Sequence, residues 1–176
     1  MNQVACLRAT QNLINDNADS LVLGFMHQGQ AWSISSVAVS VLVAPSAYYF
    51  YVIQVRRVTS EAVRAANVRE PAEKCLYDVV VHVADAAMPQ YGEDAMFEQM
   101  TLDFRKMCDR FVAVLRATRC FTAPKPDDAN KFRLLQSGER KVVVTNSDHW
   151  WSDEQGQGAP LLYSTIEFTL EEAWAA

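Results

Sequence analysis

The stretch that decides the fold is EDAMFEQMTLDFRKMCDRFVAVL, residues 93–115. Its large apolar residues recur every three or four positions, which is the spacing of one face of an α-helix. Glu93 and Asp94 stand at its start, and Arg116 and Arg119 stand at its end, as the helix dipole favours. The stretch therefore predicts a long amphipathic helix over residues 93–117. Its apolar face consists of Phe97, Met100, Phe104, Met107, Cys108, Phe111 and Leu115.

Segments typical of β-strands lie on both sides of this helix. Alternating or continuous apolar runs predict strands at 34–43, 48–58, 75–84, 131–136, 140–145 and 161–170, with turns at 44–46 and 137–138. In the segment 75–84, Cys75, Tyr77, Val79, Val81 and Val83 share one side, and Asp78 and His82 share the other. Helices are also predicted at 2–14 and, as a short second helix, at 19–27. Strands in blocks with one dominant helix between them indicate an α+β fold, in which an antiparallel or mixed β-sheet carries the long amphipathic helix and an N-terminal helix packed on one face.

The chain has 176 residues, a length that suits a single domain over residues 1–176. Three parts of it are expected to have distinct roles: an N-terminal helical segment at 1–30, an exposed arm or linker at 59–73, and a projecting loop at 146–160. Residues 20–55 contain no Asp, Glu, Lys or Arg. Their serines, glutamines and strand-like alternation argue against a membrane span, and the N-terminus lacks the pattern of a secretory signal.

Charge and cysteine usage limit the functional classes. The net charge is −5, and the segment from Lys141 to the end carries all of it, so phosphate binding by that part is disfavoured. The four cysteines are widely spaced and form no CxxC pair, which indicates reduced, mostly buried thiols in a reducing compartment. The sequence contains no phosphate-cradling, zinc-protease or nucleophile-elbow motif, so we expect no cofactor and no enzymatic activity.

Three histidines are the candidates for chemistry. His27 is expected near the end of a helix, and His82 is expected to face solvent on a strand. His149 is the strongest candidate, because Asp148 and Asp153 could complete a metal site around it. A small metal-dependent hydrolase that uses these residues is the alternative function, although a loop containing glycines is a poor frame for metal ligands.

The same loop, NSDHWWSDEQGQG at residues 146–158, carries two adjacent tryptophans. Trp150 and Trp151 are candidate protein-interface anchors, because tryptophan is enriched at interfaces and fills a partner's pocket. Asp153 and Glu154 would set the charge of this contact. The alternative is that both tryptophans cap their own domain.

A group of arginines forms the second candidate interface. Arg56, Arg57, Arg64 and Arg69 lie close together in the sequence. They could pair with acidic groups of a neighbouring subunit, for which Asp153, Glu154, Glu171 and Glu172 are candidates. With Tyr48, Tyr49 and Tyr51 they could instead form a stacking surface for nucleic acid, but these tyrosines lie in a run that is typical of a buried strand.

The arrangement of elements resembles that of the tail terminator (tail-completion) proteins of long-tailed bacteriophages. The resemblance covers roughly residues 40–174. The features that carry it are the strand YDVVVHVADA, the long amphipathic helix, the pair of strands FRLLQSGERKVVVTN taken as a hairpin, the tryptophan-bearing loop and the closing strand LLYSTIEFTLEEAW.

This resemblance implies a structural virion protein without catalytic or metal-binding residues. Such proteins form a homo-oligomeric ring, a hexamer, which caps the tail tube and joins it to the head-side connector. The implied partners are other copies of the chain, the tail tube protein and the head–tail connector protein. DNA would pass through the lumen without specific binding, and no membrane would be involved. The implied location is the tail of the virion, assembled in the host cytoplasm. A head–tail stopper or another head–tail joining protein, or a tail tube subunit, is the nearest alternative.

Overall fold

The computed structural model describes most of the chain. The described residues are 3–27, 30–31, 34, 37–39, 51–63, 72–85, 94–118, 120–125, 130–136, 141–152 and 158–173. The elements in chain order are α1 (Gln3–Asp16), α2 (Ala18–Leu21), β1 (Met26–His27), β2 (Gln30–Ala31), β3 (Val37–Val39), β4 (Tyr51–Val63), β5 (Ala72–Asp85), α3 (Asp94–Ala117), β6 (Phe121–Thr122), β7 (Lys131–Leu135), β8 (Val143–Ser152) and β9 (Gly158–Ala173).

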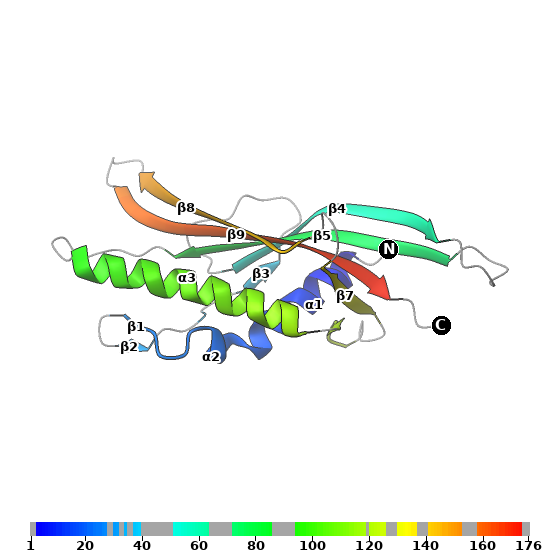
Figure 1. The fold of residues 1–176 in the computed structure, drawn as a ribbon, viewed down its shortest axis with the longest axis horizontal. Coiled ribbons are helices and arrows are strands. Elements are labelled where there is room, and N and C mark those ends of the chain that lie inside the picture. The colour runs from blue at the N-terminus through cyan, green and yellow to red at the C-terminus, as the bar shows by residue number, and fades with distance from the viewer. Residues whose placement is uncertain are drawn as a thin grey trace.

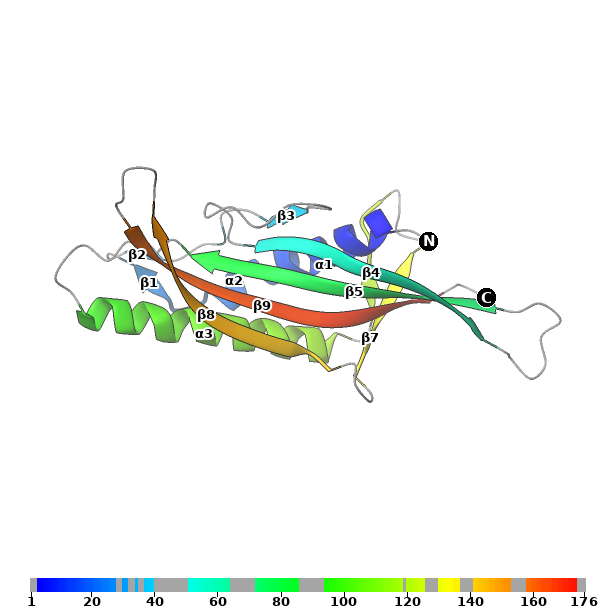
Figure 2. The same cartoon turned by 90° about the horizontal axis from the view of Figure 1, so that it is seen from above.

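A seven-stranded mixed sheet carries the helices on one face, which confirms the predicted α+β fold. The strand order is β3-β4-β5-β9-β7-β6, and β8 also pairs with β9. All pairs are antiparallel except β3 with β4, which is parallel. Helices α1, α2 and α3 lie on the same side of this sheet (Figures 1 and 2). The short hairpin of β1 and β2 forms a separate two-stranded sheet.

The long helix packs as its periodicity predicts. Its buried residues include Phe104, Met107, Cys108, Phe111 and Leu115, each at most 3% exposed. Their three- and four-residue spacing puts them on one face, so α3 buries a continuous stripe against the sheet.

The central strands supply the opposite side of this core. On β9, Leu162, Ile166, Phe168 and Leu170 are buried in one cluster with Tyr77, Val79, Val81 and Val83 of β5. Because alternate residues of a strand face the same side, this matches the expected faces of both strands. Helix α1 adds Leu7 and Ile14 to the same cluster, so one core joins both helices to the sheet.

The N-terminal part differs from the prediction after α1. The second helix ends at Leu21, and Gly24 has a φ of +81°, a left-handed conformation that glycine adopts without strain. His27 therefore lies on β1, opposite Gln30, and the prediction that it ends a helix is wrong. No helix of the described residues is long and apolar enough to cross a membrane.

The strands predicted at 34–43 and 48–58, with a turn at 44–46 between them, do not pair as a hairpin. β3 and β4 are parallel, with Val37 opposite Tyr51. Two adjacent parallel strands cannot be joined by a tight hairpin turn, because the chain must return to the starting end. The proposed turn residues 44–46 lie outside the described residues.

The described parts of the expected arm or linker at 59–73, residues 59–63 and 72–73, are paired β-strand. The pairing of β4 with β5 continues to the last pair, Val63 of β4 with Ala72 of β5. β5 pairs with β9 only from Leu76 onward. The last residues of β4 and the first of β5 thus pair only with each other in the described part of the chain. Residues 64–71 lie outside that part.

The strands at 131–136 and 140–145 do not form the expected hairpin. β7 pairs with residues 169–173 of β9, and β8 pairs with residues 158–167 of the same strand. Both run antiparallel to β9, so they follow one another along one of its edges. This is possible because β9 has 16 residues, enough for the five of β7 and the ten of β8 end to end. The expected turn residues 137–138 lie outside the described residues.

Candidate interaction surface

The predicted loop at 146–160 is mostly β-strand. Trp150 lies on β8 opposite Pro160, and Trp151 lies opposite Ala159. Asp153 and Glu154 fall between the strands, outside the described residues. Consecutive strand positions belong to opposite faces of a sheet, so the two tryptophan positions lie on different faces.

The segment nevertheless projects, as a hairpin. The pairing of β5 with β9 ends at Leu162, so the last part of β8 and residues 158–161 of β9 pair only with each other within the described residues. In Figures 1 and 2 this hairpin and the β4–β5 hairpin extend from opposite ends of the sheet. The two segments proposed as contacts, 59–73 and 146–160, therefore occupy opposite ends of one sheet.

Among the described strands, the outer side of β8 is an open strand edge. Over its ten residues β8 pairs only with β9 within the described part of the chain, and its register with β9 contains no bulge. β8 also contains no proline or glycine, and Val143 at its start is 49% exposed. An edge of this length offers a row of unpaired backbone N–H and C=O groups to another strand.

Arg56 has a partner inside its own chain. Its Nη1 donates a hydrogen bond of 2.9 Å to Oε1 of Glu167 on β9, and both side chains are about half exposed. A register shift lies between Val55 and Arg57, so Arg56 occupies a bulge in β4. Arg57 follows it and is exposed. Arg64 and Arg69 lie outside the described residues, so the structure describes Arg56 and Arg57 alone of the four arginines.

Two of the acidic residues considered as partners for these arginines are engaged elsewhere. Glu171 accepts a hydrogen bond of 2.7 Å from Nη2 of Arg133, which raises the pKa of that guanidinium. Glu172 is only 6% exposed, and its Oε2 accepts a hydrogen bond of 2.5 Å from the Tyr77 hydroxyl. The expectation that Glu172 could pair with a neighbouring subunit is therefore wrong, because its carboxylate belongs to the core.

His82 is buried rather than solvent-facing, which corrects the sequence-based prediction. It is 5% exposed, and its Nδ1 lies 2.5 Å from the hydroxyl of Tyr163. Burial lowers the pKa of His82, and Arg56 adds to this effect. Burial also raises the pKa of Tyr163. The run VVVHV around His82 has apolar residues on both sides of the strand, and this continuity is the signal that could have indicated burial.

Polar contacts cover the sheet face that carries His82. The Thr169 hydroxyl donates a hydrogen bond of 2.8 Å to Oδ1 of Asp78, on the same face as the Arg56–Glu167 and Arg133–Glu171 pairs. This face carries charged and hydroxyl groups of β4, β5, β7 and β9 beside the buried Leu76 and Val80, whereas the opposite face carries the main apolar cluster. The exposed ion pairs contribute little stability each, but they fix which side chains lie beside one another.

The metal-site hypothesis gains no support from the strand geometry. Asp148 and His149 are consecutive residues of β8, opposite Leu162 and Leu161, so their positions lie on opposite faces. Asp153 lies outside the described residues. Within the described residues, no three His, Cys, Asp or Glu side chains are grouped so that they could hold a metal ion.

The cysteines are free thiols, as predicted. Cys6, Cys75 and Cys108 are buried and Cys120 is exposed. Burial raises the pKa of Cys6, and it raises the pKa of Cys108 to about 12. Both buried thiols are therefore poor nucleophiles at neutral pH.

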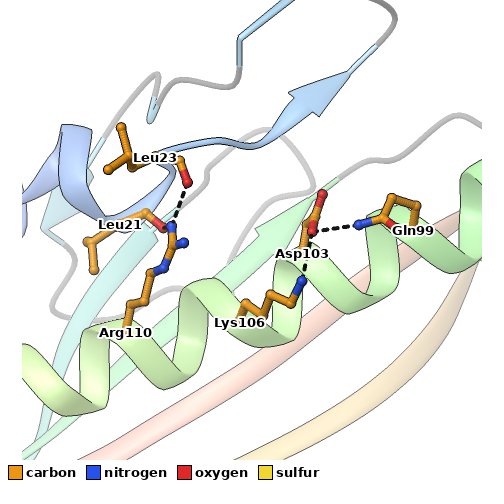
Figure 3. A network of polar contacts seen from close by, with 6 residues as sticks. All are labelled: Leu21, Leu23, Gln99, Asp103, Lys106 and Arg110. Atoms are coloured by element: carbon orange, nitrogen blue, oxygen red, sulfur yellow. Dashed lines mark hydrogen bonds and ion pairs between the residues drawn. The ribbon is translucent and has the colours of Figure 1, made fainter.

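A polar network between α3 and the N-terminal segment was not predicted. Figure 3 shows Arg110 reaching from α3 to the backbone carbonyl groups of Leu21 and Leu23. Nearer the start of α3, Oδ1 of Asp103 accepts a hydrogen bond of 2.9 Å from Nε2 of Gln99. The same oxygen lies 3.7 Å from Nζ of Lys106. In the sequence, Arg110 is a polar residue between the apolar Cys108 and Phe111. Helical periodicity does not show that its side chain binds the N-terminal segment.

Comparisons with known proteins show a distant structural likeness and no match in sequence. No family model matches the sequence, and no curated protein matches it. Among solved structures, the chain is similar to a chain described as "Virion of native gene transfer agent (GTA) particle". The alignment covers 96% of this chain and 95% of that chain, with 12% identity and a TM-score of 0.40.

Proposed function

We propose that this chain is a non-enzymatic structural protein of a phage-like tail, acting as a tail terminator. Copies of the chain would form a ring, a hexamer by the resemblance stated above, which caps the tail tube and joins it to the head-side connector. DNA would pass through the lumen of the ring without specific binding. The protein would be a component of the virion tail.

The observation that carries this proposal is the arrangement of β5, α3, β8 and β9. The strand, long helix, tryptophan-bearing segment and closing strand that resemble tail terminators fold into one sheet with α3 on one face. Both hairpins expected to make subunit contacts project from this sheet, at opposite ends. A subunit with contacts at two opposite places can join identical neighbours head to tail and so close a ring.

Trp150 and Trp151 are the proposed anchors of the subunit contact. Large aromatic side chains dominate the binding energy of many interfaces, so truncation of either one should weaken the ring. Arg57 would add electrostatic steering rather than strong binding. The same role is proposed for four residues outside the described part of the chain: Arg64, Arg69, Asp153 and Glu154.

The ring is tested by measuring the mass of the purified protein by light scattering and by imaging it with negative stain. A closed ring of fixed copy number is expected. The variants Trp150→Ala and Trp151→Ala should lower the ring fraction while the unfolding transition of the subunit stays intact. Leu102→Ala is the matched control, because Leu102 is an apolar residue on α3 that is 44% exposed and lies far from β8 in sequence.

A protein that remains monomeric at all concentrations, and that does not associate with tail tubes, would refute this function. Stoichiometric bound metal that is lost on His149→Ala would instead favour the metal-dependent hydrolase.

A further inference from the structure

Among the described strands, β3 and β8 lie at opposite edges of the main sheet, and one continuous row of paired residues connects them. Ala38 of β3 lies opposite Val52, and Val52 lies opposite His82. His82 lies opposite Thr165, and Thr165 lies opposite Thr145 of β8. Ala38 and Thr145 are therefore the two ends of the same row, at the same height on opposite edges of the sheet.

The two edges also have the strand directions needed for one to pair with the other. β8 and β5 are both antiparallel to β9, and β4 is antiparallel to β5, so β4 runs in the direction of β9. β3 is parallel to β4 and shares that direction. If a second copy is placed beside β8 in the same orientation, its β3 runs antiparallel to β8. The new pair would then have the same antiparallel geometry as the neighbouring pairs in the sheet.

β8 lacks the features that normally protect a sheet edge. Proteins block open edges with bulges, prolines, lysines or very short strands. β8 has ten residues in unbroken register with β9 and contains none of these residues. By contrast, the opposite edge consists of the three-residue β3 and, beyond Ile53, of β4, which carries a bulge and two arginines at 56 and 57. The unprotected edge is thus on the β8 side.

Symmetry favours β3 over a second β8 as the partner. Two copies joined β8 to β8 around a two-fold axis use the same surface twice, so this contact closes a dimer and cannot build a larger ring. A contact between β8 and β3 joins two different surfaces, as a ring requires. β3 lies within residues 20–55, which contain no charged side chain, so its edge does not repel Asp148 of β8.

We propose that β8 of one copy pairs with β3 of the next copy, so that the sheet continues from subunit to subunit. This inference rests on the proposed ring function and names the surface through which the ring would close. The contact joins two different surfaces of the chain, and such a contact closes into a ring when its repeated rotation adds up to a full turn. Backbone hydrogen bonds along 144–146 and 37–39 would form its centre, since these residues stand at the same height.

Cysteine cross-linking tests the pairing. In a Cys120→Ser background, which removes the exposed thiol, the double variant Ala38→Cys with Thr145→Cys is oxidised in the assembled protein. Directly opposed residues of an antiparallel pair have Cβ atoms roughly 4.5–5.5 Å apart, close enough for a disulfide after a small adjustment. We expect a ladder of covalent dimers, trimers and larger species, whereas either single variant should give none.

Two controls make the result specific. Ala38→Cys combined with Leu102→Cys places the second thiol on α3 instead of on β8, and should give no ladder. Ala38→Cys combined with a cysteine at 143 or 147 allows for a stagger of two residues between copies. Dimers from Thr145→Cys alone would show β8-to-β8 pairing and would overturn the inference, as would the absence of a ladder from all three edge combinations.

Hydrogen exchange gives a second measurement that needs no substitution. In the assembled ring, alternate amide protons of residues 143–149 should exchange roughly tenfold more slowly than in the dissociated subunit, because edge amides gain partners. A ring whose β8 amides exchange as fast as those of the monomer would refute the pairing but leave the ring function standing. A strictly monomeric protein would refute both.

Discussion

Replacing Arg110 with alanine should detach the N-terminal segment from α3. The Arg110 Nη1 donates to the carbonyl oxygens of Leu23 at 2.9 Å and Leu21 at 3.1 Å, with a longer contact of 3.4 Å to Ser20. The guanidinium carbon also lies 4.5 Å from the centroid of the Phe25 ring. One side chain therefore holds the whole turn that follows α2, as Figure 3 shows for Leu21 and Leu23.

The expected loss of stability is about 2–3 kcal/mol. A hydrogen bond from a charged donor contributes about 1.5–3 kcal/mol when shielded from water, and partial exposure reduces each of the two short bonds to about 1 kcal/mol. The cation–π contact adds about 0.5–1 kcal/mol at such a site. For a domain of this length, each kcal/mol lowers the melting temperature by about 2–4 °C, so Arg110→Ala should lower it by about 5–10 °C.

Urea unfolding of the variant and of matched controls measures this loss. Arg105→Ala removes an exposed arginine from the same helix and should change the free energy of unfolding by less than about 0.5 kcal/mol. Arg110→Lys keeps the positive charge but loses the planar guanidinium group. Its free energy of unfolding should lie between that of the unchanged protein and that of Arg110→Ala. Hydrogen exchange should become faster at residues 20–25 in Arg110→Ala. If Arg110→Ala and Arg105→Ala unfold at the same urea concentration, Arg110 does not hold the segment.

Three further predictions concern the buried polar and ionisable groups. Tyr77→Phe removes the hydroxyl that donates to the buried Glu172 carboxylate, so it should cost about 1–3 kcal/mol in urea unfolding, and a loss below about 0.5 kcal/mol would contradict the role of this bond. Burial lowers the pKa of His82 in the folded protein below the ordinary 6.5. Between the folded pKa and pH 6.5 the unfolded chain therefore binds more protons than the folded one. The free energy of unfolding should be highest above pH 6.5 and fall as the pH drops toward the folded pKa. Unfolding at pH 7 and pH 5 measures this fall, which should shrink in His82→Gln; an equal fall in that variant would exclude His82 as its source. A thiol reagent at pH 8 should label Cys120 rapidly and the three buried cysteines only on unfolding, whereas rapid loss of more than one thiol would show that the core opens.

The parts of the fold that the sequence predicted are those set by local periodicity. Helix α3 matches its predicted span within one residue, because its apolar stripe repeats over many turns. The faces of β5 and β9 were also predicted, since alternation in a strand depends only on which side meets the core. The burial of His82 was missed because alternation assumes that one face is open to water.

Strand partners could not be predicted in the same way, because pairing is not local. The strand pattern at 131–146 is compatible with a hairpin, and only the length of β9 allows β7 and β8 to share its edge instead. The polar segment at 59–63 was taken as a linker for a related reason. Beyond Leu76 the β4–β5 hairpin has no third described strand beside it, so its sequence is not required to alternate.

The change from loop to strand at 146–152 alters what the two tryptophans can do. In a loop, both could enter one pocket of a partner. On β8, Trp150 and Trp151 occupy opposite faces, so a single pocket cannot receive both. A partner strand that pairs with the edge of β8 would instead meet one tryptophan position on each side of the seam. The open edge and the two tryptophan positions, which look like separate features in the sequence, therefore belong to the same strand, so the proposed pairing of β8 would include both.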